Sequence, residues 1–166
     1  MRSAWCKIGA VEANLVPIRI RGLVVPPLLL SLLGEGRWRH PGNTALARAM
    51  PWFEGPLSFL TSTEAMARES RSLDFLTEDD ATAQLFRQAR GSEQAEPIVL
   101  PWLDVEKALL VAVNERPGDD VAIALDYRTE ATDPRVVASD FWTTPGPCSW
   151  REVTPTLSAL VVAFRL

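Results

Sequence analysis

The sequence contains few of the side chains that most often bind metals or attack substrates. Its 166 residues include two cysteines, Cys6 and Cys148, and one histidine, His40. Two thiols cannot form the dense disulfide framework of a small secreted domain, and no Cys or His pair has the spacing of a zinc site. Any mechanism that needs imidazole would depend on His40 alone. We therefore predict no catalytic residue, metal or cofactor, and a reducing, cytoplasmic location.

A long apolar run is also missing. The most hydrophobic stretch, Leu23 to Leu33, is shorter than the ~20 residues of a membrane-spanning helix, and it contains Pro26 and Pro27. Charged residues interrupt the first part of the chain, which therefore lacks the unbroken apolar core of a signal peptide. We expect neither a membrane span nor export.

The chain has no basic stripe of the kind that nucleic-acid binders use to replace phosphate counterions. It has 17 Lys and Arg residues against 21 Asp and Glu residues, which gives a net charge of −4. The nearest candidate, Arg37-Trp38-Arg39-His40, interleaves cations with an aromatic residue, but its footprint is small. We expect a solvated loop there and no nucleic-acid partner. The mild acidity favours a basic partner.

Glycine-rich phosphate loops are absent as well. Gly34 and Gly36 form a G-x-G, but the third glycine of a dinucleotide-binding loop is missing, and strands do not alternate strictly with helices. The length is that of one ordinary domain, and 47% hydrophobic and 23% charged residues are typical of globular proteins. We therefore predict a single domain over residues 1–166.

Patterning predicts helices on both sides of a run of strands. In the first half we expect a strand at Leu15–Ile20, a short helix at Leu28–Leu33 after two prolines, a loop with one helical turn at Trp38–Phe53, a strand at Leu57–Leu60, and a helix capped by Ser62 or Thr63 that ends near Ser72. In the second half we expect an amphipathic helix at 77–90, a hairpin of Ala108–Asn114 and Val121–Tyr127, a third strand at Arg135–Ala138, and a last helix capped by Thr154. This order predicts an α+β fold, with an antiparallel sheet and helices packed on one side.

Three groups of acidic residues are candidate chemical sites, because paired carboxylates can hydrolyse glycosides or hold a divalent cation. Glu78-Asp79-Asp80 lies at a helix start, and Asp119-Asp120 lies at a hairpin tip. Asp126 precedes Arg128 on the same strand face, where a structural ion pair is the simpler explanation. We therefore prefer structural roles, and a metal-dependent hydrolase is the least favoured hypothesis.

The polar run from Arg128 to Trp150 is the predicted partner-binding surface, because loops on a rigid sheet usually carry recognition. Tryptophan and arginine are enriched at interface hot spots. The predicted contact residues are Arg128, Arg135, Asp140 and Trp142, with Asp119 and Asp120 at the rim. Arg128 and Arg135 have an alternative role, in which they tie the strands to Asp126. For most of the six tryptophans, we expect burial at the ends of the core.

The last third of the chain resembles the SUKH superfamily, which includes the fungal Smi/Knr cell-wall regulators. The resemblance is carried by Ala122-Ile123-Ala124-Leu125-Asp126-Tyr127-Arg128, then Asp133-Pro134-Arg135-Val136-Val137, then Trp150 and a closing helix. Earlier features follow the family's order: a proline-led helix ending near glycines, the strand at Leu57–Leu60, and the polar turn at Gly118-Asp119-Asp120. The resemblance covers residues 22–166, approximately. The material from Pro41 to Phe53 is additional to the family pattern.

This resemblance implies an α+β immunity protein, which bacteria make to neutralise a cognate polymorphic toxin by binding it. No catalytic residue is carried over from the family. A mildly acidic inhibitor would suit a basic toxin, such as a nuclease, because complementary charge speeds association. The alternative hypothesis is a regulatory or scaffolding module like the fungal proteins. Both hypotheses predict a non-catalytic, protein-binding protein.

Overall fold

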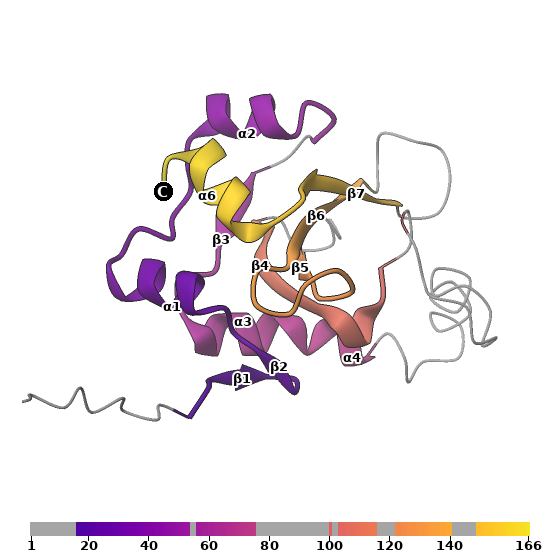
Figure 1. Ribbon diagram of the computed structural model, residues 1–166. Helices are drawn as coiled ribbons and strands as arrows, with labels where there is room; N and C mark the ends of the chain where they lie inside the picture. Colours follow the sequence, from indigo (N-terminus) through magenta and orange to yellow (C-terminus); the bar gives the residue numbers. More distant parts are fainter. Residues whose placement is uncertain (1–15, 54–55, 76–99, 101–102, 116–121, 141–148) are drawn as a thin grey trace, which may run out of the picture.

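The computed structural model describes residues 16–53, 56–75, 100, 103–115, 122–140 and 149–166. These residues form helices and antiparallel sheets in one chain (Figure 1), which confirms the predicted α+β class. The amphipathic helix predicted at 77–90 lies outside the described residues. Among the helices that are described, none combines the length and the apolar character needed to cross a bilayer.

The main sheet has five antiparallel strands whose spatial order follows the chain. The predicted hairpin and third strand are confirmed as its centre, and one further strand pairs on each side. The strands are β3 (Leu57–Phe59), β4 (Ala108–Asn114), β5 (Ala122–Asp126), β6 (Arg135–Asp140) and β7 (Ser149–Thr154).

The centre of the sheet is buried on both faces. Successive side chains of a strand point to opposite faces, yet all five residues of β5 are buried. A sheet with one solvated face would expose every second residue. Both faces of the sheet are therefore covered at its centre, whereas the sequence predicts helices on one face.

Strand β7 is absent from the pattern that the sequence predicts. Val136 and Val137 are neighbours in β6, but they pair with Thr154 and Glu152 of β7. Val153 is therefore an extra, bulged residue. A bulge shifts the side chains out of strict alternation, and Arg151 and Glu152 are both exposed. The strand signal is lost for that reason.

The unpredicted strand also corrects the start of the last helix, α6 (Leu157–Phe164). Thr154 is the final residue of β7 rather than the helix cap. The cap is Thr156, whose side chain accepts a hydrogen bond from the Ala159 amide at 3.1 Å. Threonine therefore caps the helix as expected, but two positions later.

The other helices follow their sequence signals to different degrees. A helix begins at Pro27 directly after Pro26, and the Ser62 side chain caps another by accepting from Ala65, as predicted. The segment expected to hold one helical turn instead contains a seven-residue helix with a single buried residue, Leu46. One buried residue gives no apolar period to detect. These helices are α1 (Pro27–Gly34), α2 (Asn43–Ala49), α3 (Thr63–Ser70) and α4 (Ser72–Phe75).

β3 pairs with only part of β4, and beyond it side chains form hydrogen bonds with the backbone. α3 packs along β4, and the Ser70 hydroxyl accepts a hydrogen bond from the Leu110 amide at 3.0 Å. Arg21 donates to the carbonyl oxygens of Val105 and Ala108, each at 2.8 Å. Arg21 has a φ of 52° and begins the tight turn that joins β1 (Arg19–Ile20) to β2 (Leu23–Val24). Buried backbone groups of β4 therefore find partners without a further strand.

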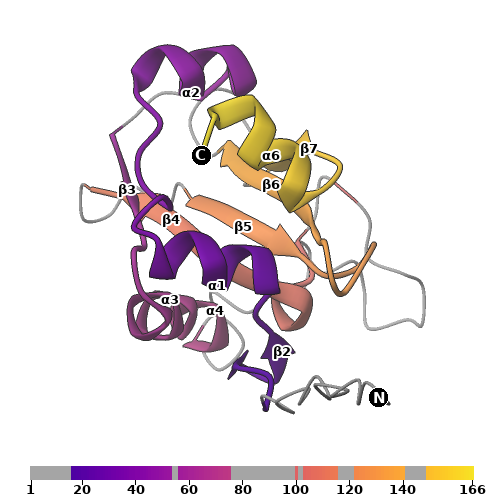
Figure 2. The same ribbon diagram turned by 60° about the vertical axis from the view of Figure 1, so that its left-hand side comes forward.

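Aromatic rings join the α1–α2 segment to the sheet and to α6. The Trp38 and Phe59 rings lie 5.4 Å apart, and the Phe59 and Phe164 rings lie 6.3 Å apart. Trp38 and Trp150 are buried, as expected for tryptophans at the ends of a core. Figure 2 shows α6 lying against β6 and β7, with α2 beside it.

The burial of α6 gives a first prediction. Leu160 is fully buried, so Leu160→Ala should lower the free energy of unfolding by about 2–5 kcal/mol through loss of contacts and formation of a cavity. Val162 on the same helix is 78% exposed, and Val162→Ala should change it by less than about 0.5 kcal/mol. Urea denaturation of both variants measures the difference. Equal losses would contradict the packing described for α6.

Candidate functional site

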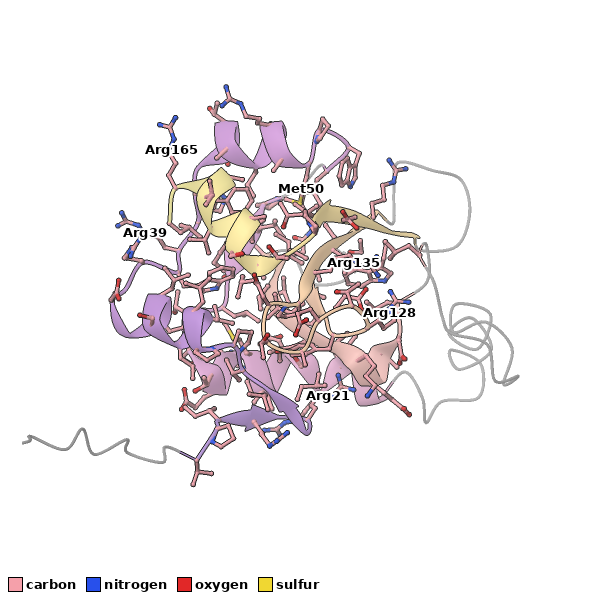
Figure 3. All side chains as sticks on the ribbon, in the orientation of Figure 1. Arg21, Arg39, Met50, Arg128, Arg135 and Arg165 are labelled. Carbon is pink, nitrogen blue, oxygen red and sulfur yellow. The ribbon has the colours of Figure 1, made fainter. Side chains whose placement is uncertain are left out.

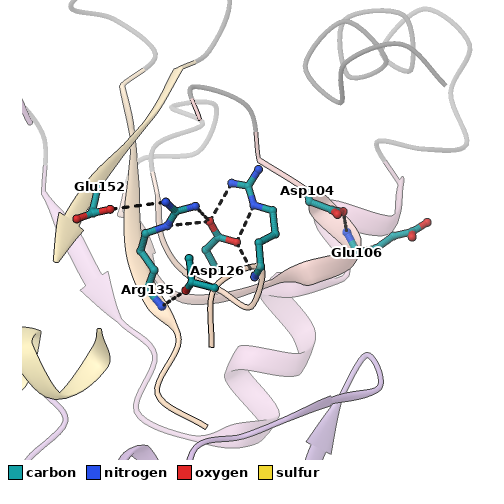
Figure 4. Close-up of polar contacts among 7 residues, drawn as sticks. Asp104, Glu106, Asp126, Arg135 and Glu152 are labelled. Carbon is teal, nitrogen blue, oxygen red and sulfur yellow. Dashed lines mark hydrogen bonds and ion pairs between the residues drawn. The ribbon is translucent and has the colours of Figure 1, made fainter. Parts of the chain in front are cut away.

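A buried carboxylate with two arginine partners lies where β5 ends. Asp126 is the last residue of β5, and its side chain is fully buried. Arg128 donates from Nε to Oδ1 and from Nη2 to Oδ2, both at 2.8 Å. Arg135 donates from Nη2 to Oδ2 at 2.6 Å and from Nε at 3.2 Å (Figure 4). The structural role that the sequence suggested for these two arginines is therefore present.

Local geometry explains why these three residues meet. Arg135 begins β6 directly opposite Asp126 in the antiparallel register, and cross-strand partners share a face of the sheet. Arg128 follows two residues after Asp126, and its own amide also donates to Oδ1 at 3.1 Å. Arg135 reaches Glu152 of β7 as well, at 3.6 Å. The cluster thus joins β5, β6 and β7, and we call Asp126, Arg128 and Arg135 the aspartate clamp.

The clamp keeps Asp126 ionised. Burial by itself raises the pKa of a carboxyl, but hydrogen bonds from Arg128 and Arg135 outweigh it and hold the pKa of Asp126 below its ordinary value of 3.8. Its neighbour Tyr127 is fixed in a different way, since its hydroxyl donates to the Val24 carbonyl at 2.8 Å. Burial raises the pKa of Tyr127 well above 10.0.

The loop after the clamp, residues 129–133, is tied down at both ends, and we call it the clamped loop. At its start, the Thr129 hydroxyl accepts from the Arg135 amide at 3.4 Å. At its end, the Asp133 carboxylate accepts from the Ser158 amide at 2.9 Å and from the Ser158 hydroxyl. These bonds attach the loop to the first turn of α6, where a carboxylate also opposes the positive end of the helix. The loop therefore has a defined conformation.

The tip of the clamped loop is exposed and carries an ordered negative charge. Residues 129–132 are all exposed. Glu130 accepts from the Thr132 amide at 3.2 Å and from its hydroxyl at 2.9 Å. These hydrogen bonds lower the pKa of Glu130 below its ordinary value of 4.5. The tip thus presents an ionised carboxylate in a fixed position.

The structure brings two of the predicted contact residues together, and three others lie outside the described residues. Arg128 and Arg135 lie together, but their guanidinium groups bind Asp126. Asp140 ends β6, and Trp142, Asp119 and Asp120 lie outside the described residues. Sequence reasoning missed Glu130, Asp133 and Ser158 as parts of one unit, since Asp133 and Ser158 are 25 positions apart and no local pattern links them.

Other candidate residues have ordinary structural surroundings. His40 is exposed, and its Nδ1 accepts a hydrogen bond from the Gly42 amide at 3.0 Å. Within the described part of the chain, no three His, Cys, Asp or Glu side chains are grouped as metal ligands.

The chain was also compared with known proteins. No family model, curated protein or solved structure matched it. The resemblance to the SUKH superfamily therefore stays a prediction from the motifs of the sequence.

The clamp predicts a large loss of stability on Asp126→Asn. This substitution removes the negative charge between two partly buried guanidinium groups, and breaking a buried ion pair on one side costs about 3–5 kcal/mol. The control is Glu152→Gln, because Glu152 is 45% exposed and an exposed ion pair contributes less than about 1 kcal/mol. Denaturant melts of the two variants should differ by about 2 kcal/mol or more. Similar melts would show that the clamp is not a stabilising element.

The direction of the Asp126 pKa shift predicts how stability depends on pH. A carboxyl whose pKa is lowered by folding stabilises the protein above its unfolded pKa, and this contribution is lost as the pH falls towards the folded pKa. The free energy of unfolding should therefore decrease below about pH 4. Urea melts at a series of acidic pH values measure this slope. Asp126→Asn should flatten it, and an unchanged slope would assign the acid sensitivity to other carboxyls.

Proposed function

We propose that this protein is a non-catalytic binding protein whose partner is another protein, and that the clamped loop forms part of the binding surface. The observation that carries this proposal is the anchoring of an exposed loop at both ends, by Arg135 on one side and Ser158 on the other. A loop already held in one conformation loses less conformational entropy when a partner binds. Loops held on a rigid sheet are also the usual carriers of recognition.

The charge of the loop tip indicates the chemistry of the partner. Glu130 is ionised and exposed, and the whole chain carries a net charge of −4. A basic protein would be attracted over a distance and would associate faster. Together with the SUKH resemblance, this supports an immunity protein that neutralises a basic toxin in the cytoplasm. A regulatory module of the Smi/Knr type shares the fold expectation but does not require a basic partner.

Of the three acidic groups considered for a hydrolase, the structure describes Asp126, and its surroundings favour a structural role. Both carboxylate oxygens of Asp126 accept hydrogen bonds from guanidinium groups at 2.6–2.8 Å. A carboxylate in this state neither accepts a substrate proton readily nor offers an oxygen to a metal ion without breaking the clamp. Asp126 is therefore assigned to structure.

The partner can be identified with the 166-residue chain as bait. Affinity capture from the native lysate, followed by mass spectrometry, should recover a basic protein in stoichiometric amount. If the partner is a toxin enzyme, adding the purified chain should abolish its activity. Failure to recover a basic protein, or recovery of a basic enzyme whose activity does not change, would contradict the immunity role.

Two substitutions locate the contact once the partner is known. Glu130→Gln removes the charge at the loop tip and should slow association and reduce its salt dependence. Trp142→Ala removes the predicted aromatic anchor and should weaken affinity by about 2 kcal/mol, mainly through faster dissociation. The matched control is Glu64→Gln, an exposed acid in the first turn of α3. Surface plasmon resonance measures all three, after thermal melts confirm folding. If Glu130→Gln and Trp142→Ala bind like the control, the interface lies elsewhere.

A further inference from the structure

A second charged surface lies away from the clamp. Arg39 follows α1, and Arg165 directly follows α6, which ends at Phe164. Figure 3 shows Arg39 and Arg165 on the left side of the molecule, whereas Arg128 and Arg135 lie on the right. We call Arg37, Arg39 and Arg165 the basic corner.

A hydrogen bond brings the two ends of the basic corner together. Arg37 donates from Nη2 to the backbone oxygen of Leu166 at 2.6 Å, which joins the segment after α1 to the segment after α6. Its Nη1 binds Glu35 at 2.9 Å. Arg37 therefore acts as a brace that holds the backbone of Arg165 near the segment that carries Arg39. The charge of Arg37 is offset by Glu35, while those of Arg39 and Arg165 are not.

The backbone at Arg165 is unusual for its residue type. Arg165 has a φ of 55° and caps α6 in the left-handed conformation. Glycine is the common residue there, because a side chain makes this conformation less favourable. Among the described residues, Arg21 also has a positive φ, and it has a structural use because it donates to two carbonyl oxygens, those of Val105 and Ala108. A strained position that retains a charged side chain points to a use for that charge.

The two uncompensated arginines are available for binding. Arg39 and Arg165 are exposed, and neither side chain makes a hydrogen bond or an ion pair with any residue in the described ranges. The Arg165 amide donates to the Val162 carbonyl oxygen at 3.3 Å, and the Val162 side chain is 78% exposed. The corner thus combines two exposed guanidinium groups with one exposed apolar side chain nearby in the chain.

We propose that the basic corner binds an acidic segment of a protein, with carboxylates at Arg39 and Arg165 and an apolar side chain against Val162. Guanidinium groups match carboxylates in geometry as well as in charge. A single-stranded nucleic acid fits less well, because such binders stack bases on exposed aromatic rings, and Trp38 is only 1% exposed. The net charge of −4 also opposes a long polyanion.

The test uses the full chain and a defined probe, a fluorescent peptide of alternating glutamate and leucine. Arg165→Gly removes the charge while suiting the left-handed backbone, and Arg39→Glu reverses the other charge. The double variant should weaken peptide binding by about tenfold, as measured by fluorescence anisotropy at low salt. The control is Arg71→Glu, an exposed arginine just after α3, which changes net charge elsewhere and should have little effect.

Three results would overturn the proposal. Equal weakening by Arg71→Glu would mean that the peptide responds to net charge alone. Tighter binding of oligothymidylate than of the peptide would assign the corner to nucleic acid. Self-association of the chain that is lost in the double variant would make a second copy the occupant. The proposal is supported if the peptide binds more tightly than oligothymidylate, if its affinity depends on salt, and if the double variant weakens this binding while Arg71→Glu does not.

Discussion

The charge of Asp126 is the constraint on which the end of the sheet depends. A carboxylate without solvent exposure is tolerated only when it is paired and hydrogen-bonded. The pairing comes from Arg128 and Arg135, so the end of β5, the start of β6 and the segment between them must adopt one arrangement together. Glu152 extends the same network to β7. A single buried charge thus holds the end of β5 against the start of β6 and supports the exposed loop between them.

Polar groups find their partners in different ways around β4 and around β5 and β6. Around β4, neutral and charged donors and acceptors satisfy the backbone, as Ser70 does for Leu110. Around β5 and β6, opposite charges satisfy each other. The first arrangement closes a strand edge, whereas the second leaves side chains of both signs near the surface. The proposed binding loop lies at the β5–β6 end and carries the negative charge of Glu130, whereas the basic corner is a separate surface with positive side chains.

Much of the fold could be predicted because local signals agreed with the final packing. The strands β4 and β5 are apolar and separated by a turn-forming sequence, and Ser62 marks the start of α3. The failures have specific causes: the bulge at Val153 hides β7, and α2 has only one buried residue. The ion pair between Asp126 and Arg128 could be predicted because it is local. The anchoring of Asp133 by Ser158 could not, since it depends on how α6 packs.

The hydrogen bond between Ser70 and the Leu110 amide has a consequence for hydrogen exchange. An amide within a paired strand is protected until the strands separate. The Leu110 amide is protected instead by a side chain at the end of α3. Its deuterium uptake therefore reports the opening of α3 rather than of the sheet. One amide within β4 thus measures the local stability of a neighbouring helix.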